Sequence, residues 1–422
     1  MESLHGCVQL DLSAMARRAP RAGVASEWLN WTIPHPDPRP LVQGKARWPL
    51  SRVCRFSSAC YMPRSASVHV YAKDGMRGIV DGGTILAGYR WRQEVVVRMA
   101  RGSMEERPMH RMRTEDAILF HHSWTSYFHV LESAMGVFAA AHLLSTSLAQ
   151  TQIYLSSQRD PVPLARLFSG IFAQPVQSVA ASHSQPVCHS RLAVGYPAQV
   201  LHSAWSTSLN AMPTYFTHRF RQHVYAAHAV PLKGEPSGAV IIHRAKSRGI
   251  TNEAEIIQAF GALQPPVHAV SVDLASMPTR AQVALMSRSK FLLGVHGAGM
   301  ANAVFLHRKG TAILIKQHHY YAAYLESLLL SLEVNWECWQ APSGQLQWTV
   351  MHPSKCRKNW EYDCIRDQDT KVDVSQLPAM VERARQGPAA RPCTQTKIPR
   401  KEVACFKLCF PNGPPRDLLP DS

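Results

Sequence analysis

The segment 290–305, KFLLGVHGAGMANAVF, constrains the fold of this chain most. It begins as a short apolar run, is interrupted by glycines and one histidine, and continues with apolar residues at helical spacing. This pattern predicts a strand, a tight turn and a helix. Glycine allows positive φ angles and a close approach of backbone to ligand, and the first N–H groups of a helix attract anions. We therefore expect an anion at this turn, with a diphosphate as the favoured candidate.

The residues around the turn alternate between apolar runs and amphipathic segments. We predict strands at 239–243, 268–272, 291–295, 312–316 and 334–338, and helices at 252–263, from about Pro278 to 286 and at 320–332. Asn252 and Glu255 give the first helix a start that resembles a capping box. This order predicts an α/β fold with a doubly wound parallel sheet, whose ligands bind beyond the carboxyl ends of the strands. His296 and Gly297 fall at such an end.

Two motifs in this region resemble glycosyltransferase family 61. They are IIHRAKSRGITNE at 241–253 and LGVHGAG at 293–299, with one strand and one helix between them. Further segments are similar to the branch that resembles the extracellular O-linked N-acetylglucosamine transferase, namely LFSG at 167–170, VC at 187–188, KCR at 355–357 and RDQDT at 366–370. The matches follow the family order over about 119–374. The resemblance implies a GT-B-like fold, in which two Rossmann-like domains face each other across a cleft.

For function, the resemblance implies inverting transfer of a sugar from a nucleotide sugar to a hydroxyl group. The best match is N-acetylglucosamine carried by UDP, with a protein or a glycan as acceptor, in the endoplasmic reticulum or Golgi lumen. Transfer of a pentose, xylose or arabinose, is the closest alternative. A homologue that binds a nucleotide sugar or a glycan without turnover is another. The UDP-sugar is a co-substrate, and we expect no essential cofactor.

The composition fits an ordinary globular enzyme. The 422 residues suffice for two or three domains, and 46 Lys and Arg against 29 Asp and Glu leave a formal charge of +17. Such a charge favours anionic partners, from nucleotide diphosphates to acidic glycans, membranes or nucleic acid. The basic residues are scattered without a nucleic-acid-binding motif, so we expect no nucleic acid and keep a polyanion binder as an alternative. The ten cysteines permit disulfides, require none and form no zinc pattern.

The chain divides into four predicted regions. Residues 1–66 are irregular or partly disordered, 67–232 form an acceptor-side Rossmann-like domain, 238–345 form the nucleotide-sugar-binding Rossmann-like domain, and 346–422 are a tail packed partly back on the domains. We see no transmembrane segment, and residues 1–20 lack the apolar run of a signal peptide or anchor. The lumenal location is therefore an expectation from the resemblance.

A departing diphosphate needs positive charge and backbone donors. Arg244 and Arg248 follow the first strand of the predicted sheet, and guanidinium groups bind phosphate oxygens bidentately. The predicted donor-binding residues are Arg244, Arg248, Asn252, Gly294, His296, Gly297, Ala298, Gly299 and Asn302. Structural alternatives are a solvated loop charge, a core histidine, and small residues that let a strand and a helix pack closely.

The catalytic residues are predicted in both domains, with His296 at the turn and His129 and Glu132 in the first domain. The segment YFHVLE at 127–132 resembles a family segment in which an acidic residue follows a histidine by three positions. On a helix these positions share a face, so the two groups point together and can accept the acceptor proton. Family members often carry Asp where this chain has Glu132. A structural ion pair is the alternative, and His121 or His122 can substitute as the base.

Two other enzyme classes fit less well. The glycine spacing G-x-x-G-x-G differs from the dinucleotide fingerprint, and Lys316 stands where a nicotinamide enzyme carries an acidic residue. The segment Asp367–Asp369 matches the D-x-D pattern of metal-dependent transferases but lies in the tail, after no strand of the donor domain. We interpret it as a turn or a tail contact. No metal is expected, because arginines and a helix dipole can neutralise the leaving group.

Overall fold

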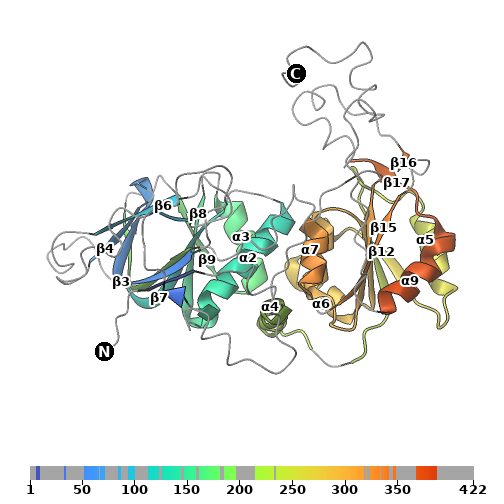
Figure 1. The fold of residues 1–422 in the computed structure, drawn as a ribbon, viewed down its shortest axis with the longest axis horizontal. Helices are drawn as coiled ribbons and strands as arrows, with labels where there is room; N and C mark the ends of the chain where they lie inside the picture. Colours follow the sequence, from blue (N-terminus) through green and yellow to red (C-terminus); the bar gives the residue numbers. More distant parts are fainter. Residues whose placement is uncertain are drawn as a thin grey trace, which may run out of the picture. The chain divides into compact units, whose positions relative to one another are not determined.

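The computed structural model describes residues 6–9, 33–34, 52–65, 67–71, 84–86, 94–99, 113–122, 126–143, 147–157, 161–180, 185–195, 214–231, 234–317, 320, 324–332, 334–341, 346–347 and 367–386. The chain divides into two compact units (Figure 1). Unit 1 contains the residues up to Leu201 and Tyr215–Ala227, and unit 2 contains the others. Each unit holds one large sheet with helices packed on it, so the predicted α/β class is confirmed.

Unit 1 contains a mixed sheet in the order β5-β6-β4-β3-β10-β7-β8-β9, with β1 beside β3 and β2 beside β1. Its strands are β1 (Gly6–Gln9), β2 (Ile33–Pro34), β3 (Arg52–Met62), β4 (Ser67–Val70), β5 (Thr84–Leu86), β6 (Glu94–Met99), β7 (Arg113–His121), β8 (Thr151–Ser157), β9 (Val176–Ala180) and β10 (Val187–Gly195). β10, β7, β8 and β9 run parallel, whereas β3 is antiparallel to β4 and β10.

Two helices of unit 1 pack beside the parallel half of this sheet, α2 (Tyr127–Leu143) and α3 (Pro161–Phe172). Unit 1 also contains α4 (Thr214–Ala227) and the short 3-10 helices η2 (Pro63–Ser65), between β3 and β4, and η4 (Leu148–Gln150), before β8. α2 connects β7 to β8, and α3 connects β8 to β9. Phe220 of α4 meets Phe138 of α2 edge to face. The Rossmann-like pattern therefore describes the half from β10 to β9, while the other half of the sheet is mixed.

The predicted irregular region 1–66 is wrong for residues 52–62, which form β3. β3 lies inside the sheet between β4 and β10, and its Phe56 and Tyr61 are buried. Its partner residues on β10 lie more than a hundred positions away in sequence. A local window shows only short apolar stretches broken by arginine and serine, because the pairing that stabilises β3 comes from distant strands.

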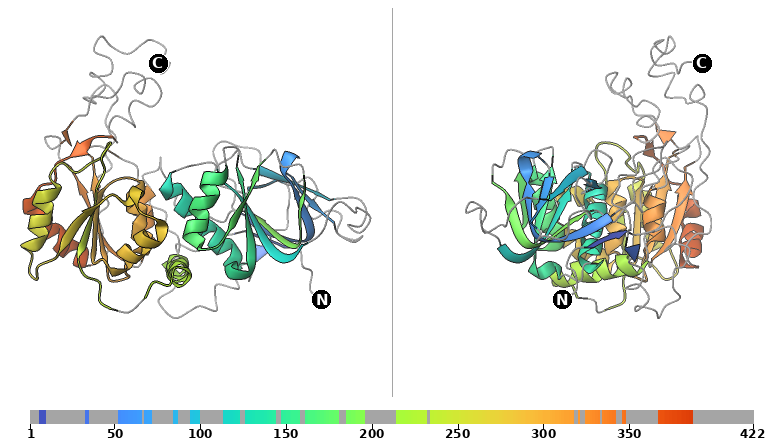
Figure 2. Two further views of the ribbon diagram at one scale, coloured as in Figure 1. Left: turned by 180° about the vertical axis from the view of Figure 1, so that it is seen from behind. Right: turned by 60° about the vertical axis from the view of Figure 1, so that its left-hand side comes forward.

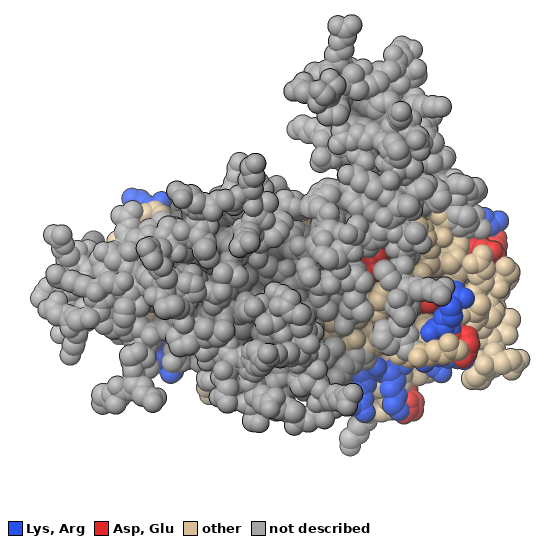
Figure 3. Space-filling view, viewed as in Figure 1, with Lys and Arg blue, Asp and Glu red and all other residues tan. Residues whose placement is uncertain are grey.

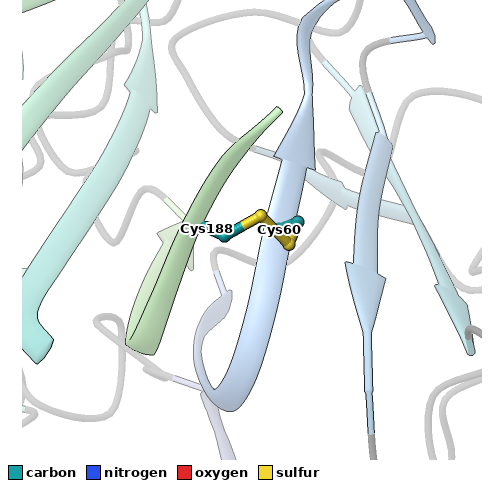
Figure 4. The surroundings of a disulfide bond; sticks show 2 residues. All are labelled: Cys60 and Cys188. Atoms are coloured by element: carbon teal, nitrogen blue, oxygen red, sulfur yellow. A yellow bond between two sulfur atoms is a disulfide. The ribbon is translucent and has the colours of Figure 1, made fainter. Parts of the chain in front are cut away.

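A disulfide joins β3 to β10 (Figure 4). Cys60 and Cys188 face each other in the antiparallel register, with 4.0 Å between their Cα atoms and a sequence separation of 128. Cys338, on β15 (Asn335–Gln340), is also disulfide-bonded. The composition alone did not decide whether the cysteines form disulfides, and the structure shows that Cys60, Cys188 and Cys338 do. Disulfides persist in oxidising compartments such as the secretory lumen.

Unit 2 contains a parallel sheet in the order β12-β11-β13-β14-β15. Its strands are β11 (Ala239–Ile242), β12 (Ala269–Val272), β13 (Phe291–Val295), β14 (Thr311–Lys316) and β15, and its helices are α5 (Glu253–Gly261), η5 (Leu274–Ser276), α6 (Thr279–Arg288), η6 (Ala298–Phe305), α7 (Tyr324–Leu330), η8 (Val374–Gln376) and α9 (Leu377–Arg385). β16 (Leu346–Gln347) and β17 (Asp369–Thr370) form a separate antiparallel pair. Figures 1 and 2 show α5 and α9 on one face of the sheet and α6 and α7 on the other. The predicted doubly wound parallel sheet is therefore present in unit 2.

Two predicted helices differ in detail from the structure. The helix after the glycine turn is the 3-10 helix η6, in which residues 300–305 are all buried, so packing rather than helix propensity sets its winding. The helix predicted at 320–332 begins later, as α7. The predicted tail contains α9, whose Met380 and Val381 pack with Phe260 of α5 in the core of unit 2. No helix in the described ranges is long and apolar enough to span a membrane.

Candidate functional site

The centre of the unit 2 sheet is a topological switch point. β11 and β13 are neighbours, but the chain leaves β11 toward α5 on one face and leaves β13 toward η6 on the other. Ligands of doubly wound sheets bind in the crevice that such a divergence leaves at the carboxyl ends of the two strands. Two segments start there: residues 243–252 after β11, which we name the arginine loop, and residues 296–299 after β13, the glycine turn.

Two guanidinium groups of the arginine loop lie against the glycine turn. A Cβ atom built on Gly297 would lie 2.8 Å from Arg244 Nη1 and 3.3 Å from Arg248 Nη1. Arg244 Nε donates a hydrogen bond to the Ser247 carbonyl at 2.9 Å, and Arg248 Nε lies 3.4 Å from Asp367 Oδ1. Arg244 Nε is thus hydrogen-bonded within the loop, Arg248 Nε is in ion-pair range of Asp367 without a hydrogen bond, and an Nη group of each arginine lies near the turn. The structure brings together the arginines and the turn that the sequence pointed to.

The glycines of the turn serve different purposes. A Cβ on Gly294 would meet Ile242 Cδ1 at 2.9 Å and Met300 Sδ at 3.0 Å, and one on Gly299 would meet Ile242 Cγ2 at 3.2 Å. Gly294 and Gly299 therefore fit the packing alternative, because they let η6 lie close to β11. Gly297 is the glycine whose missing side chain leaves room for the guanidinium groups.

The expected positive φ angles are absent from these glycines. Gly297 is extended, with φ 170° and ψ 175°, and the described glycines with positive φ are Gly234 and Gly238. The left-handed residue of the site is instead Arg248, with φ 59°. Non-glycine residues in this region are uncommon and are held there by their surroundings. The glycines of the turn are therefore explained by neighbouring side chains that lie close to the backbone, and not by a left-handed φ angle.

His296 is the first residue of the glycine turn. Its side chain is fully buried, its backbone N–H donates to the Ile315 carbonyl at 2.7 Å, and its ring meets the Tyr320 ring edge to face at 4.5 Å. Beside them, Lys316 Nζ donates to Glu326 Oε1 at 2.6 Å in an ion pair with no exposed surface. Sequence reasoning missed this cluster, although one signal was available. Lys316 and Glu326 are isolated opposite charges in two apolar segments, TAILIK and YLESLLL.

The two asparagines predicted at the donor site are engaged within the protein. Asn252 is buried, donates to the Val372 carbonyl at 2.8 Å and to Glu255 at 3.0 Å, and accepts from the Val372 N–H at 2.9 Å. It makes no side-chain cap on α5, so its predicted capping is wrong. Its amide is bonded to the tail instead, and its predicted donor contact stays a prediction. Asn302 is buried and donates to the Gly299 carbonyl at 3.1 Å, which holds the turn. Ala298 is partly exposed at the start of η6.

In unit 1, the predicted histidine and glutamate pair is present on α2. His129 Nδ1 lies 3.3 Å from Glu132 Oε2, with the glutamate fully buried and the histidine 18% exposed. The carboxyl end of β7 is next to this pair in sequence, and there His122 Nδ1 lies 2.8 Å from Ser133 Oγ of α2. His121 Nδ1 lies 3.3 Å from Ser156 Oγ at the end of β8. The catalytic role of the pair stays a prediction.

Unit 1 is expected to lose stability in mild acid. Burial lowers the pKa of His121 from its ordinary value of 6.5 to about 4. Below pH 6.5, His121 binds a proton in the unfolded chain but stays neutral in the folded protein. His121 therefore lowers the free energy of unfolding by up to about 3 kcal/mol as the pH falls from 6.5 to 4. Burial also lowers the pKa of His142, His189 and His223, which adds in the same direction.

Chemical denaturation between pH 7 and 5 measures this effect, and the variant His121→Gln is expected to flatten the profile. A wild-type stability that does not change over this range would contradict the expectation.

The described residues contain no group of three or more His, Cys, Asp and Glu side chains that could hold a metal ion. The segment Asp367–Asp369 contacts the arginine loop, as the interpretation of a tail contact requires: Asp369 Oδ1 accepts from the Gly249 N–H at 2.7 Å. That transfer needs no metal stays a prediction.

The family model Glycosyltransferase 61 matches residues 93–314, just over half of the 422 residues. This chain belongs to glycosyltransferase family 61. The matched range contains α2 with His129 and Glu132, the arginine loop and the glycine turn. The resemblance seen in the sequence motifs is therefore confirmed.

The chain is also similar to protein O-linked-mannose beta-1,4-N-acetylglucosaminyltransferase 2 of Canis lupus familiaris, with 26% identity over 213 residues. The match covers 41% of this chain and 36% of that protein, so it spans about a third of the relative's length. Two solved structures of the bacterial glycosyltransferase TibC align at 10% identity, each over 65% of this chain. One, from enterotoxigenic E. coli H10407, aligns over 77% of its own chain with a TM-score of 0.32. The other, a complex with ADP-D-β-D-heptose, aligns over 79% with a TM-score of 0.29. TM-scores this low do not establish a shared fold.

Proposed function

We propose that this chain is an inverting glycosyltransferase that binds the diphosphate of a UDP-sugar at the carboxyl ends of β11 and β13. The observation that carries the proposal is the close approach of the Arg244 and Arg248 guanidinium groups to Gly297 at the switch point of the sheet. Two positive charges and the N–H groups at the start of η6 together form a site for an anion with several oxygens. Membership of a glycosyltransferase family supports a nucleotide sugar as that anion.

Transfer with inversion is one displacement at the anomeric carbon. The acceptor oxygen forms the new bond and gives its proton to a base, while UDP leaves with the bonding electrons and gains negative charge. Arg244 and Arg248 suit the leaving group, because charge-assisted hydrogen bonds strengthen as charge develops on the diphosphate. We assign His296 and Asn302 positioning roles, since both are buried beside the turn.

On the acceptor side we propose Glu132 as the base, with His129 as its hydrogen-bonded partner. The 3.3 Å contact and the burial of the carboxylate support this pair. A GT-B-like arrangement, with a cleft between the two units, belongs to the proposal.

The sugar and the compartment are proposed from relatedness. N-acetylglucosamine from UDP, transferred to a protein or glycan hydroxyl, agrees with the name of the canine relative. The disulfide between Cys60 and Cys188 supports the oxidising lumen of the endoplasmic reticulum or Golgi. Pentose transfer is the alternative within the family. Guanidinium groups at the diphosphate agree with a reaction that requires no metal.

Replacing Arg244 with alanine is expected to weaken UDP binding by about 10- to 100-fold, because a hydrogen bond to a charged group contributes about 1.5–3 kcal/mol. Isothermal titration calorimetry with UDP measures the change. Lys246→Ala is the matched control, since it removes the same charge from an exposed position of the arginine loop. It is expected to change the affinity by about twofold at most.

Equal UDP affinities of wild type and Arg244→Ala would remove the basis of the proposal. A panel of UDP-sugars then separates the remaining alternatives by UDP release. Consumption of UDP-N-acetylglucosamine supports the proposed donor, and preference for UDP-xylose or UDP-arabinose identifies a pentosyltransferase. UDP binding without consumption of any donor identifies a binding homologue.

The polyanion binder has less support. On the face shown in Figure 3, the described part of unit 2 carries basic and acidic side chains next to each other. Lys309 pairs with Glu235 at 2.7 Å, and Arg383 pairs with Glu337 at 2.8 Å. A nucleic-acid site requires clustered basic residues on one face. Mixed charge of this kind is typical of an ordinary solvated surface.

A further inference from the structure

The second half of the arginine loop, residues 249–252, is paired with a segment more than a hundred residues further on. We name residues 367–372 the clamp segment. The Thr370 N–H donates to the Gly249 carbonyl at 2.9 Å, and the Thr251 N–H donates to the Thr370 carbonyl at 3.1 Å. Ile250 and Thr370 form a parallel β-bridge. The loop is therefore held by backbone pairing although it lies outside the main sheet.

Two carboxylates of the clamp segment reach the arginine-bearing end of the loop. Asp369 Oδ1 accepts from the Gly249 N–H at 2.7 Å, and Asp367 Oδ1 lies 3.4 Å from Arg248 Nε. Gly249 is tightly packed on two sides, since a Cβ built on it would meet the Arg244 carbonyl at 3.0 Å and Asp369 Oδ1 at 3.3 Å. Asp369 is thus packed against the backbone of Gly249, the residue that follows Arg248.

A buried amide fixes the other end of the loop. Asn252 accepts from the Val372 N–H and donates to the Val372 carbonyl, so the two residues exchange a pair of hydrogen bonds. Between these ends, Arg248 has a left-handed φ of 59°. Such a conformation costs of order 1–3 kcal/mol and persists where neighbouring contacts impose it. The clamp segment supplies those contacts next to Arg248.

We propose that the clamp segment is a positioning element for donor binding, in which Asp369 holds the loop backbone and Asp367 orients the Arg248 guanidinium toward Gly297. The inference rests on the proposed function of the site and adds residues to it. It also gives the D-x-D pattern of the tail a role other than metal binding. Both aspartates act through Arg248 and its backbone and make no contact with the sugar donor.

The test is UDP affinity, measured by calorimetry in the full chain. Asp369→Ala is expected to bind UDP about tenfold more weakly, which corresponds to about 1.4 kcal/mol. Asp369→Asn keeps an oxygen that accepts the same N–H and is expected to bind UDP like wild type. Asp373→Ala is the matched control, because Asp373 lies on the same stretch of chain but caps η8 through Ser375. It is expected to leave UDP affinity unchanged.

A double-mutant cycle tests whether Asp369 acts through Arg248. If it does, adding Asp369→Ala to Arg248→Ala weakens UDP binding no further than Arg248→Ala alone, whereas general structural damage gives additive losses. Additive losses of UDP affinity in the double variant, or equal effects of Asp369→Ala and Asp373→Ala on UDP affinity, would overturn the proposal. A Mn²⁺-dependent gain in UDP affinity that Asp369→Asn abolishes would overturn it in favour of a metal site. Failure of the donor site itself is recognised separately, because Arg244→Ala then also leaves UDP affinity unchanged.

Discussion

Replacing Lys316 with methionine is expected to destabilise unit 2 by about 3–5 kcal/mol, because the variant leaves a buried carboxylate without its partner. Lys316 and Glu326 have no exposed surface, and their contact of 2.6 Å joins the end of β14 to α7. Glu326 Oε2 has no hydrogen-bond partner among the described residues, so the lysine is the main compensation for burying the charge. Burial raises the pKa of Glu326, and the charge of Lys316 opposes that rise.

Thermal unfolding is the measurement, with an expected fall in Tm of about 10 °C for the loss of stability given above. Lys309→Met is the control, because Lys309 makes a similar contact of 2.7 Å with Glu235 but both side chains are more than half exposed. Surface pairs of this kind contribute about 0–1 kcal/mol. The double variant Lys316→Met with Glu326→Leu is expected to recover most of the loss, since it removes both buried charges. Equal Tm values for the two single lysine variants would contradict this account.

The second large effect is expected at Gly297, and it concerns binding rather than stability. Alanine at this position would place its Cβ 2.8 Å from Arg244 Nη1 and 3.3 Å from Arg248 Nη1. The extended backbone of Gly297 suits any residue, and the clash is with the far ends of flexible side chains, so folding is expected to change by less than about 0.5 kcal/mol. Both guanidinium groups must move, however, and UDP affinity is expected to fall by about 100-fold, or 2.7 kcal/mol.

Gly294→Ala, at the end of β13, is expected to give the opposite result: a loss of stability with UDP affinity almost unchanged. Its Cβ would meet Ile242 and Met300 in the core, so the expected result is a loss of about 1–3 kcal/mol of stability from overpacking. The arginines do not line this position, and UDP affinity of the folded variant is expected to stay within about threefold of wild type. Calorimetry and denaturant unfolding on both variants measure the contrast. If Gly297→Ala binds UDP like wild type, the guanidinium groups are not the diphosphate site.

The structure of unit 2 was largely predictable from local patterns. Each of its strands lies within a few residues of the predicted range, because a buried parallel strand is a short apolar run bounded by turn residues. The pairing of His129 with Glu132 was predictable for a similar reason, since helical spacing alone puts positions three apart on one face. The family motifs placed the arginines and the glycine turn in one site, and the strand order brought them together.

Unit 1 was harder to predict. The strand β3 is stabilised by β4 and by β10, and its disulfide partner Cys188 is separated from Cys60 by 128 residues. Sheets of mixed direction have no fixed succession of strand and helix, so their strands lack the regular spacing that revealed unit 2. The domain boundary at residue 67 was drawn inside this unit for that reason.

The sequence by itself determined the parallel α/β arrangement around the glycine turn, the residue types available there and membership of the family, because periodicity and short motifs are local properties of the chain. The tertiary structure alone decided which contacts those residues make. Gly297 lies near the arginines whereas Gly294 and Gly299 pack against Ile242, the His296 side chain is buried, the Asn252 amide is bonded to the tail, and Asp369 lies against Gly249. These roles depend on contacts between residues up to 120 positions apart, which only the folded chain brings into reach.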